Sequence, residues 1–184
     1  ISCSLVGSEM CIRDSSYRGR MEVSGSRISR EDFAAYITQV SDVIAAMTKD
    51  GYPHPTAFEI ETAVAFLFFK KENCDLVLLE VGMGGNLDAT NIIKNTLLAV
   101  LVSISMDHMS FLGNTLAQIA EKKAGIIKDG CRVVTARQKP EAMQVIERIS
   151  REHGAKCTIA DASEAEVLLS LIHISEPTRL QLIS

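Results

Sequence analysis

Apolar and polar residues follow one another along this chain in a pattern that predicts alternating strands and helices. Short apolar runs that suit β-strands cover residues 21–23, 76–79, 97–104, 131–135 and 157–159. Between them, apolar residues recur at helical spacing, which predicts amphipathic helices. The run 76–79 is continuously apolar and 97–104 is interrupted by Ser103 alone, as is typical of strands buried on both faces of a parallel sheet. The pattern therefore predicts an α/β fold, with a mostly parallel sheet flanked by helices.

Each of the four predicted helices begins at a recognisable start signal. Three have a hydroxyl residue followed three positions later by an acid or an amide, and the fourth has a proline in its first turn. These signals are Ser29 with Asp32, Thr56 with Glu59, Thr115 with Gln118, and Pro140. The segment 56–59 also has a second interpretation, as part of a pocket for a planar ligand. The pattern by itself favours capping and core packing there.

A glycine-rich stretch, EVGMGGNLDATN at residues 80–91, follows the apolar run 76–79 directly. Its three glycines allow a sharp turn and a close approach of the backbone to a ligand. Asp88, Thr90 and Asn91 then add short polar side chains. Because open α/β sheets bind ligands at the carboxyl ends of their strands, this stretch is the first candidate for a binding site.

The next apolar run, 97–104, also ends in polar residues, Ser105-Met106-Asp107-His108. Neighbouring parallel strands thus bring a carboxylate, Glu80, and an imidazole, His108, to the same edge of the sheet. Either side chain could be purely structural. Together they also suit a metal or phosphate site, and the residues alone leave both interpretations open.

Composition narrows the class of protein. The length of 184 residues suggests one domain, and 47% hydrophobic with 23% charged residues is typical of a globular protein. A formal net charge of −4 gives no reason to expect a nucleic-acid partner, and no apolar stretch is long enough to predict a membrane span. Cys74, Cys131 and Cys157 are scattered without metal-ligand spacing, which predicts free structural thiols in a reducing cytoplasm.

The two ends of the chain have an unusual relationship to each other. A DNA sequence that encodes residues 169–179 reads on its opposite strand as LVGSEMCIRD, which is the sequence of residues 5–14. Two independent natural segments are not expected to encode each other in this way. We therefore predict that residues 1–15 and 169–184 are translated sequencing adapter, and that residues 16–168 are the natural part.

Several segments together resemble the folylpolyglutamate synthase/dihydrofolate synthase family of the Mur-ligase superfamily. The resemblance covers essentially all of residues 16–168, and its most specific part is the glycine-rich stretch with LDATN. The other matching segments are PTAFE at 55–59, Asp107-His108, Leu112-Gly113, and KAGI at 123–126. The implied fold is part of a Mur-ligase-type central ATPase domain.

The resemblance implies a ligase that uses ATP and Mg²⁺ to add L-glutamate to dihydropteroate, to folate polyglutamates, or to both. A folate or pteroate carboxylate is phosphorylated, and the amine of glutamate then attacks the acyl phosphate. Glu80 and His108 match the family's magnesium ligands, and Lys123 matches a catalytic lysine carried as an N6-carboxylate. The substrate-binding positions match Thr56, Ala57, Phe58, Glu59, Leu87, Asp88 and Ala89. The enzyme is expected to be a cytoplasmic monomer without nucleic-acid or membrane partners.

Two residues depart from the family pattern. Asn86 stands where the family usually has arginine, and Lys122 stands where a glutamate is common. No G-x-x-x-x-G-K-[ST] motif occurs in the sequence, although phosphate binding needs one. In this family that motif would precede Ser16, and a C-terminal domain would follow Leu168, so we expect this chain by itself to be inactive.

Two alternatives compete with this interpretation. The first is another Mur-type ligase that uses the same acyl-phosphate chemistry, against which the LDATN sequence argues. The second is a folate-binding module that has lost its phosphate-binding loop. The predicted adapter ends argue against the second, since truncation would explain the missing motif.

Overall fold

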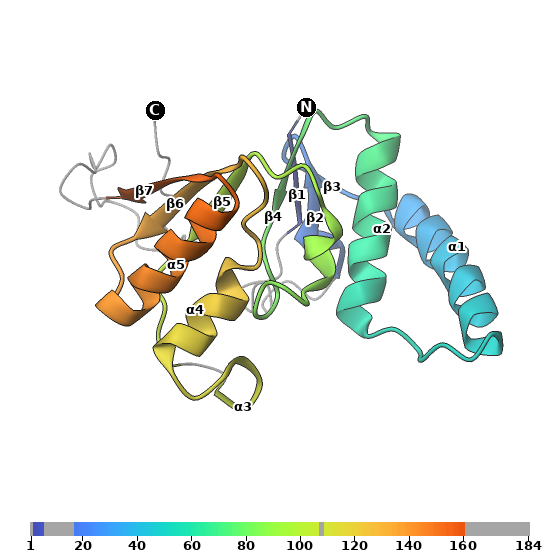
Figure 1. Ribbon diagram of the computed structural model, residues 1–184. Coiled ribbons are helices and arrows are strands. Elements are labelled where there is room, and N and C mark those ends of the chain that lie inside the picture. Colours follow the sequence, from blue (N-terminus) through green and yellow to red (C-terminus); the bar gives the residue numbers. More distant parts are fainter. Residues whose placement is uncertain (1, 6–16, 107–108, 161–184) are drawn as a thin grey trace, which may run out of the picture. The chain divides into compact units, whose positions relative to one another are not determined.

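The chain combines strands with helices, as the apolar pattern predicted, although some helices and some strands follow one another directly. The computed structural model describes residues 2–5, 17–106 and 109–160, and it separates the chain into two units, residues 1–95 and 96–184 (Figure 1). Each unit has its own sheet and its own hydrophobic core. The α/β prediction is confirmed, whereas the predicted natural part, residues 16–168 as one partial domain, stays a prediction.

The first unit is built on a four-stranded sheet in the order β3-β2-β1-β4. β1 runs parallel to β4 and antiparallel to β2, while β2 and β3 form a hairpin around Ser24 and Gly25. The hairpin makes this sheet mixed rather than wholly parallel. The strand bounds are Ser2–Leu5 for β1, Met21–Val23 for β2, Ser26–Arg27 for β3 and Leu76–Leu79 for β4.

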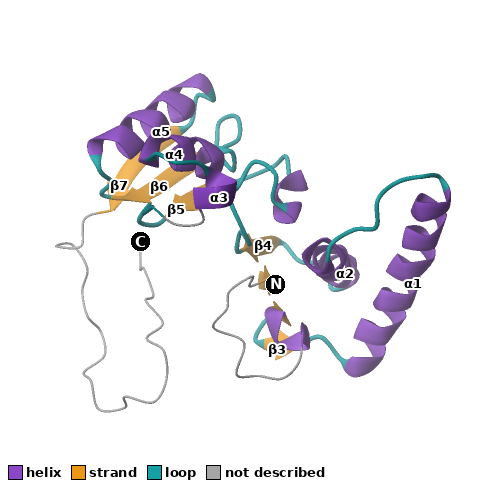
Figure 2. Ribbon diagram, turned by 90° about the horizontal axis from the view of Figure 1, so that it is seen from below, coloured by secondary structure: helices purple, strands orange, loops and turns teal. Residues whose placement is uncertain are grey.

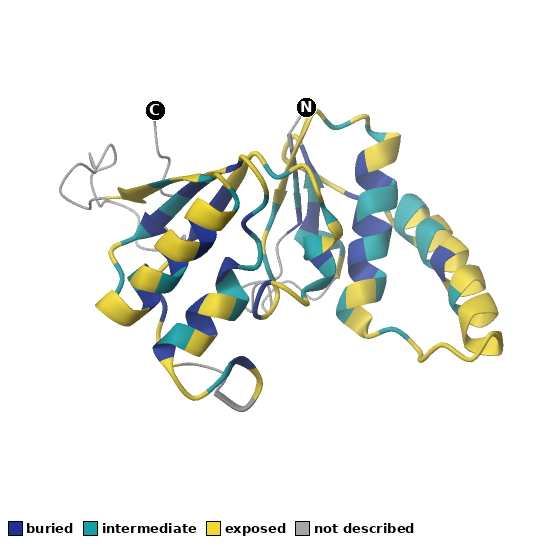
Figure 3. Cartoon of the chain, in the orientation of Figure 1, coloured by how far each residue is buried: buried dark blue, intermediate teal, exposed yellow. Residues whose placement is uncertain are grey.

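Two long helices, α1 (Arg30–Lys49) and α2 (Ala57–Lys71), lie side by side in this unit (Figure 1). Short 3-10 helices, η2 (Tyr17–Arg20) and η3 (Ala89–Ile92), precede β2 and follow the glycine-rich stretch. The buried stripe of α2 is visible in Figure 3, and it packs into the core of the unit. That stripe contains Val64, Ala65, Phe68 and Phe69.

The second unit has a wholly parallel sheet in the order β5-β6-β7. Helices α4 and α5 pack against this sheet and contribute much of its core (Figure 2). The strands are β5 (Leu98–Leu101), β6 (Arg132–Ala136) and β7 (Lys156–Ala160). The helices are α3 (Met109–Leu112), α4 (Leu116–Ala124) and α5 (Pro140–Glu152), and α3 was not predicted from the sequence.

The sequence predicted that the strands at residues 76–79 and 97–104 are buried on both faces. Within its own unit, neither strand is buried in this way. β4 lies at the edge of its sheet, where Leu76 and Leu78 are 53% and 69% exposed and only Leu79 packs against the core. In β5, another edge strand, buried and exposed side chains alternate, and Ala99 and Leu101 face the core. A continuous apolar run does not show which strand will be at an edge, so the sequence could not predict this difference.

A disulfide corrects the expectation of free thiols. Cys3 on β1 and Cys74, just before β4, have Cα atoms 6.2 Å apart, and their sulfurs are bonded. The sequence-based expectation set Cys3 aside with the predicted adapter segment, and so left Cys74 without a partner. Cys131 and Cys157 are free thiols, as predicted.

Within 2–5, 17–106 and 109–160, no helix has the length and apolar character that crossing a membrane requires.

Candidate functional site

Helix α2 begins with the capping box that the sequence predicted. The side chain of Glu59 accepts from the backbone N–H and from the hydroxyl of Thr56, at 2.7 and 2.8 Å, and the Thr56 oxygen accepts from the backbone N–H of Glu59 at 3.3 Å. These hydrogen bonds hold the pKa of the Glu59 carboxyl below its usual range. The cap fixes the path of the chain where Ala57 and Phe58 enter the helix.

The glycine-rich stretch is organised internally by Asp88. One carboxylate oxygen of Asp88 accepts from the backbone N–H of Met83 at 2.9 Å. The other accepts from the backbone N–H of Thr90 at 3.0 Å and from its hydroxyl at 2.6 Å. Both oxygens therefore stabilise the loop, and Asp88 also caps the start of η3. This local role was not anticipated when Asp88 was predicted as a substrate-binding residue.

Gly82 joins the two predicted substrate-binding segments. A Cβ atom at this position would lie 2.9 Å from the Phe58 ring and 3.2 Å from a carboxylate oxygen of Asp88. Only glycine therefore allows the loop to approach the start of α2 this closely. The structure thus brings Phe58 and Asp88, which are thirty positions apart in sequence, to the same glycine.

An exposed apolar surface lies on the same loop. Leu87, a predicted substrate-binding residue, is 89% exposed, and Met83 and Ile92 are also exposed. Ala89 and Phe58 are half-buried. Scattered exposed apolar residues are ordinary, but three within the segment 83–92 suit contact with a flat ligand.

Glu80 stands directly after β4, where the sequence placed it. Its backbone N–H donates to the carbonyl oxygen of Leu5 at 2.9 Å, so the end of β1 holds the backbone at this point. Its exposed side chain has no hydrogen-bond or ion-pair partner among the described residues. A free carboxylate at a strand end fits Mg²⁺, which prefers oxygen ligands.

The other predicted active-site residues are in the second unit. Lys123 is half-buried in the last turn of α4, and His108 lies outside the described residues. No group of three or more His, Cys, Asp and Glu side chains suited to a metal occurs within the part of the chain that the structure describes. The metal and catalytic roles of Glu80, His108 and Lys123 therefore stay predictions.

The sequence matches the Mur ligase middle domain over residues 29–181. The chain belongs to the Mur ligase middle-domain family. Such a domain fits the α/β architecture and the glycine-rich stretch described above.

Relatives of this Mur ligase middle domain are folate enzymes. It is 44% identical over 140 residues to a dihydrofolate synthase/folylpolyglutamate synthase of Bacillus subtilis, covering 76% of this chain and 32% of the relative. A Mycobacterium tuberculosis folylpolyglutamate synthase complexed with ADP and AMPPCP superimposes with a TM-score of 0.77 and 31% identity, over 88% of this chain and 37% of that one. An "FPGS-AMPPCP-folate complex" gives a TM-score of 0.78 at 26% identity, over 88% and 38%. The domain thus spans about a third of the length of these proteins.

Sequence reasoning missed an ion pair that fixes α2 of this Mur ligase middle domain. The guanidinium of Arg20 on η2 donates to the carboxylate of Glu61 at 2.7 Å, and the side chain of Glu61 is only 8% exposed. Arg20 also lies over the ring of Tyr17, 5.5 Å from its centroid. The two charges are 41 positions apart in sequence, so no local spacing could have revealed the pair.

The residues at the two positions that depart from the expected family pattern make local hydrogen bonds, Asn86 through its backbone and Lys122 through its side chain. The carbonyl oxygen of Asn86 accepts from the side-chain amide of Asn91 at 3.3 Å, which closes the loop on itself. The ammonium of Lys122 donates to the carbonyl oxygen of Phe111. Lys122 thus ties α4 to the end of α3.

Proposed function

We propose that this Mur ligase middle domain is part of an ATP-dependent ligase that adds L-glutamate to dihydropteroate, to folate polyglutamates, or to both. The observation that carries the proposal is that Phe58 and Asp88 both lie close to Gly82, because these two residues come from the two segments predicted to bind the pterin. The similarity to folylpolyglutamate synthases supports the same substrate class. Since the domain is about a third as long as these relatives, the activity belongs to a longer protein.

The first unit supplies the substrate-binding residues. The Phe58 ring and the apolar side chains of Leu87 and Ala89 suit the flat face of a pterin, and Thr56 and Ala57 lie at the start of the same helix as Phe58. Glu59 and Asp88 shape this surface through their hydrogen bonds, so both can act without direct contact with the ligand. The proposed pterin-binding surface consists of seven residues: Thr56, Ala57, Phe58, Glu59, Leu87, Asp88 and Ala89.

The reaction needs charge compensation, since a carboxylate must approach the γ-phosphate of ATP. The substrate carboxylate attacks the γ-phosphorus and ADP leaves. The free amine of glutamate then attacks the acyl carbon, phosphate leaves, and the amine loses a proton. Glu80 and His108 would hold a Mg²⁺ ion, which offsets the negative charge of the phosphates when bound. Lys123, as an N6-carboxylate, would supply an anionic oxygen of the kind that binds a metal.

The proposal includes a monomer in the cytoplasm, with folate or pteroate, glutamate and ATP as its small-molecule substrates. These assignments rest on the resemblance to the synthase family.

The test uses the complete protein encoded at the native locus. ADP release that requires both glutamate and dihydropteroate or tetrahydrofolate is the expected result. Glu80→Gln, His108→Ala and Lys123→Arg should each lower kcat by about a hundredfold or more, whereas Glu31→Gln, on an exposed face of α1, should not. Turnover of nucleotide-sugar precursors in place of folates would show another Mur-type ligase, and binding of folate without any turnover would show a binding module.

A further inference from the structure

A side chain makes hydrogen bonds to the backbone that follows strand β5. β5 and β6 pair in parallel register, with Leu98 opposite Arg132 and Leu101 opposite Thr135. β5 ends at Leu101 and β6 ends at Ala136. The backbone beyond Leu101 nevertheless keeps partners, through the side-chain amide of Gln138.

Gln138 bonds this segment from both ends of its amide group. Its nitrogen Nε2 donates to the carbonyl oxygen of Val102 at 2.9 Å, and its oxygen Oε1 accepts from the backbone N–H of Ile104 at 2.9 Å. The ladder between β5 and β6 uses every second residue of β6, because the backbone N–H of Arg132, which is opposite Leu98, donates to the carbonyl oxygen of Leu97 at 3.0 Å. That alternation continues through residues 134 and 136, so the bonds of Gln138 to Val102 and Ile104 are additional to the ladder and hold the segment that follows β5.

A third hydrogen bond fixes the orientation of this amide. Nε2 also donates to the hydroxyl oxygen of Thr135 at 3.0 Å, and Thr135 is 1% exposed. The Thr135 hydroxyl donates to the carbonyl oxygen of Ala136 at 3.0 Å, so its lone pair is available to Nε2. Ile104 is buried, while Gln138 itself is half-buried. The amide thus has both hydrogens and its oxygen engaged, which leaves little freedom to rotate.

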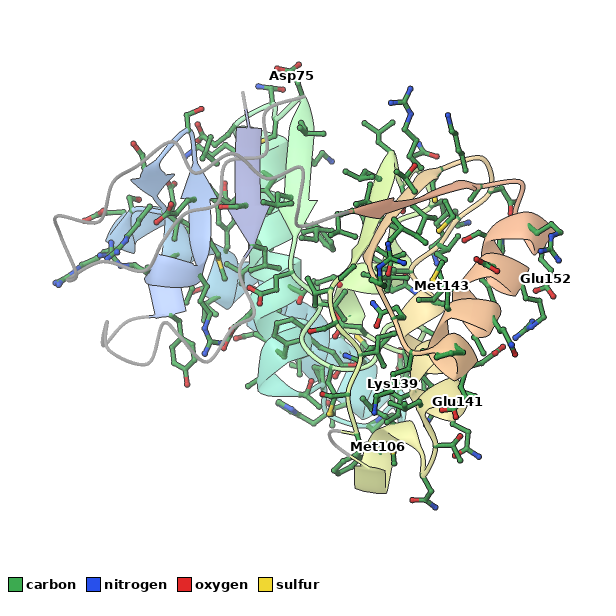
Figure 4. The ribbon with its side chains drawn as sticks, turned by 90° about the vertical axis from the view of Figure 1, so that its left-hand side faces the viewer. Asp75, Met106, Lys139, Glu141, Met143 and Glu152 are labelled. Atoms are coloured by element: carbon green, nitrogen blue, oxygen red, sulfur yellow. A yellow bond between two sulfur atoms is a disulfide. The ribbon has the colours of Figure 1, made fainter. Side chains whose placement is uncertain are left out.

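We propose that Gln138 is a positioning residue that holds the segment after β5 by side-chain hydrogen bonds and so sets the direction of the chain through Ser105 and Met106. Its importance for the reaction rests on the proposed function, in which His108, two residues further along and outside the described residues, binds Mg²⁺. Met106 and Lys139, which follow the bonded segment and Gln138 in sequence, are labelled in Figure 4.

The chemistry of an amide is required at this position. A glutamate would keep an acceptor for Ile104 but would place a carboxylate oxygen against the carbonyl of Val102. An asparagine would be shorter by one methylene. A methionine has a similar length and no hydrogen-bonding amide, which makes Gln138→Met the sharpest variant. Gln144→Met is its matched control, because Gln144 is exposed on α5.

The first experiment measures amide hydrogen exchange by NMR in this chain. Gln138→Met should speed exchange of the Ile104 N–H by about tenfold and shift the amide signals of Ser105 and Met106. Exchange at Val133, inside β6, should stay unchanged and thus shows that the fold is intact. Gln144→Met should change none of these signals. Unaltered exchange at Ile104 in Gln138→Met would overturn the proposal.

The second experiment measures the Mg²⁺ dependence of the complete ligase. Gln138→Met should raise the Mg²⁺ concentration for half-maximal rate by about tenfold and leave the KM for glutamate unchanged. A fall in kcat with an unchanged Mg²⁺ dependence would overturn the positioning role. If the unaltered protein has no ligase activity, the proposed function fails, and the exchange of Ile104 still decides whether Gln138 orients the strand end.

Discussion

Asp88 shows how a residue predicted to bind substrate can act first on its own loop. Its two carboxylate oxygens accept three hydrogen bonds from Met83 and Thr90. A carboxylate held by backbone N–H groups in this way cannot be replaced by an apolar side chain without leaving those groups unpaired. Loop geometry and ligand contact therefore depend on the same side chain.

Asp88→Ala should lower the free energy of unfolding by about 2 kcal/mol, because it removes charge-assisted hydrogen bonds from partly buried donors. Urea denaturation followed by circular dichroism measures the change. Asp42→Ala, at an exposed position on α1, is the matched control and should have little effect. Equal stabilities of the two variants would show that the loop does not depend on Asp88.

Helices α1 and α2 both start with a carboxyl group whose pKa is lowered. For Asp32 the main cause is the hydrogen bond from Lys71, followed by that from the Ser29 cap, and for Glu59 it is the backbone N–H of Thr56. A carboxyl with a lowered folded-state pKa stabilises the fold above its unfolded pKa, which is 4.5 for glutamate. That contribution disappears as the pH falls through the folded-state pKa.

Removing the charge of Glu59 should therefore reduce the acid sensitivity of the chain. We expect a smaller loss of stability between about pH 7 and pH 3 for Glu59→Gln than for the unaltered chain. Urea midpoints at the two pH values measure it. Glu31→Gln, whose exposed carboxylate lies in the first turn of α1, should keep the full acid sensitivity. A Glu59→Gln variant that loses as much stability as this control would contradict the role of the cap.

The helices were predictable because their start signals are local. The caps at Ser29, Thr56 and Thr115 join residues three positions apart, and the structure shows all three. The pairs Arg20–Glu61 and Val102–Gln138 join residues 41 and 36 positions apart, and each depends on how distant elements meet. The burial of β4 and β5 was mispredicted for a related reason, since an apolar run does not show which strands form the edges of a sheet. Among the predicted site residues, the sequence could name Phe58 and Asp88 but could not show that Gly82 joins them.

For the molecule as a whole, the Cys3–Cys74 disulfide links residues 71 positions apart. Closing a loop of this length restricts the unfolded chain, so a reductant should lower the free energy of unfolding by about 4 kcal/mol. Cys3→Ser should have the same effect without reductant, while Cys157→Ser should respond to reductant as the unaltered chain does. Denaturation with and without dithiothreitol measures this. No change on reduction would contradict a stabilising bridge.

If residues 1–15 are translated adapter, as predicted, then Cys3 is not a residue of the natural protein. Sequencing the native locus should give residues other than those at 5–14 and 169–179, together with a phosphate-binding loop upstream. If the genome encodes both segments as they stand, the adapter prediction is wrong and binding becomes a better proposal than catalysis.

The chain by itself should bind ATP only weakly, with a Kd above about 1 mM, because its sequence contains no phosphate-binding loop motif. Isothermal titration with ATP and Mg²⁺ measures this, and the complete protein from the native locus is the comparison. Tight binding by the chain alone would show that the phosphates are held by other residues.

The close approach at Gly82 also limits how this surface can be redesigned. Phe58 and Asp88 both lie against the place where a side chain at position 82 would begin, so a larger residue there requires a smaller one at position 58. Substitutions at touching positions are not independent in their effects. A change of ligand preference is therefore expected to need paired substitutions, one on α2 and one on the loop, and libraries that vary single positions should miss it.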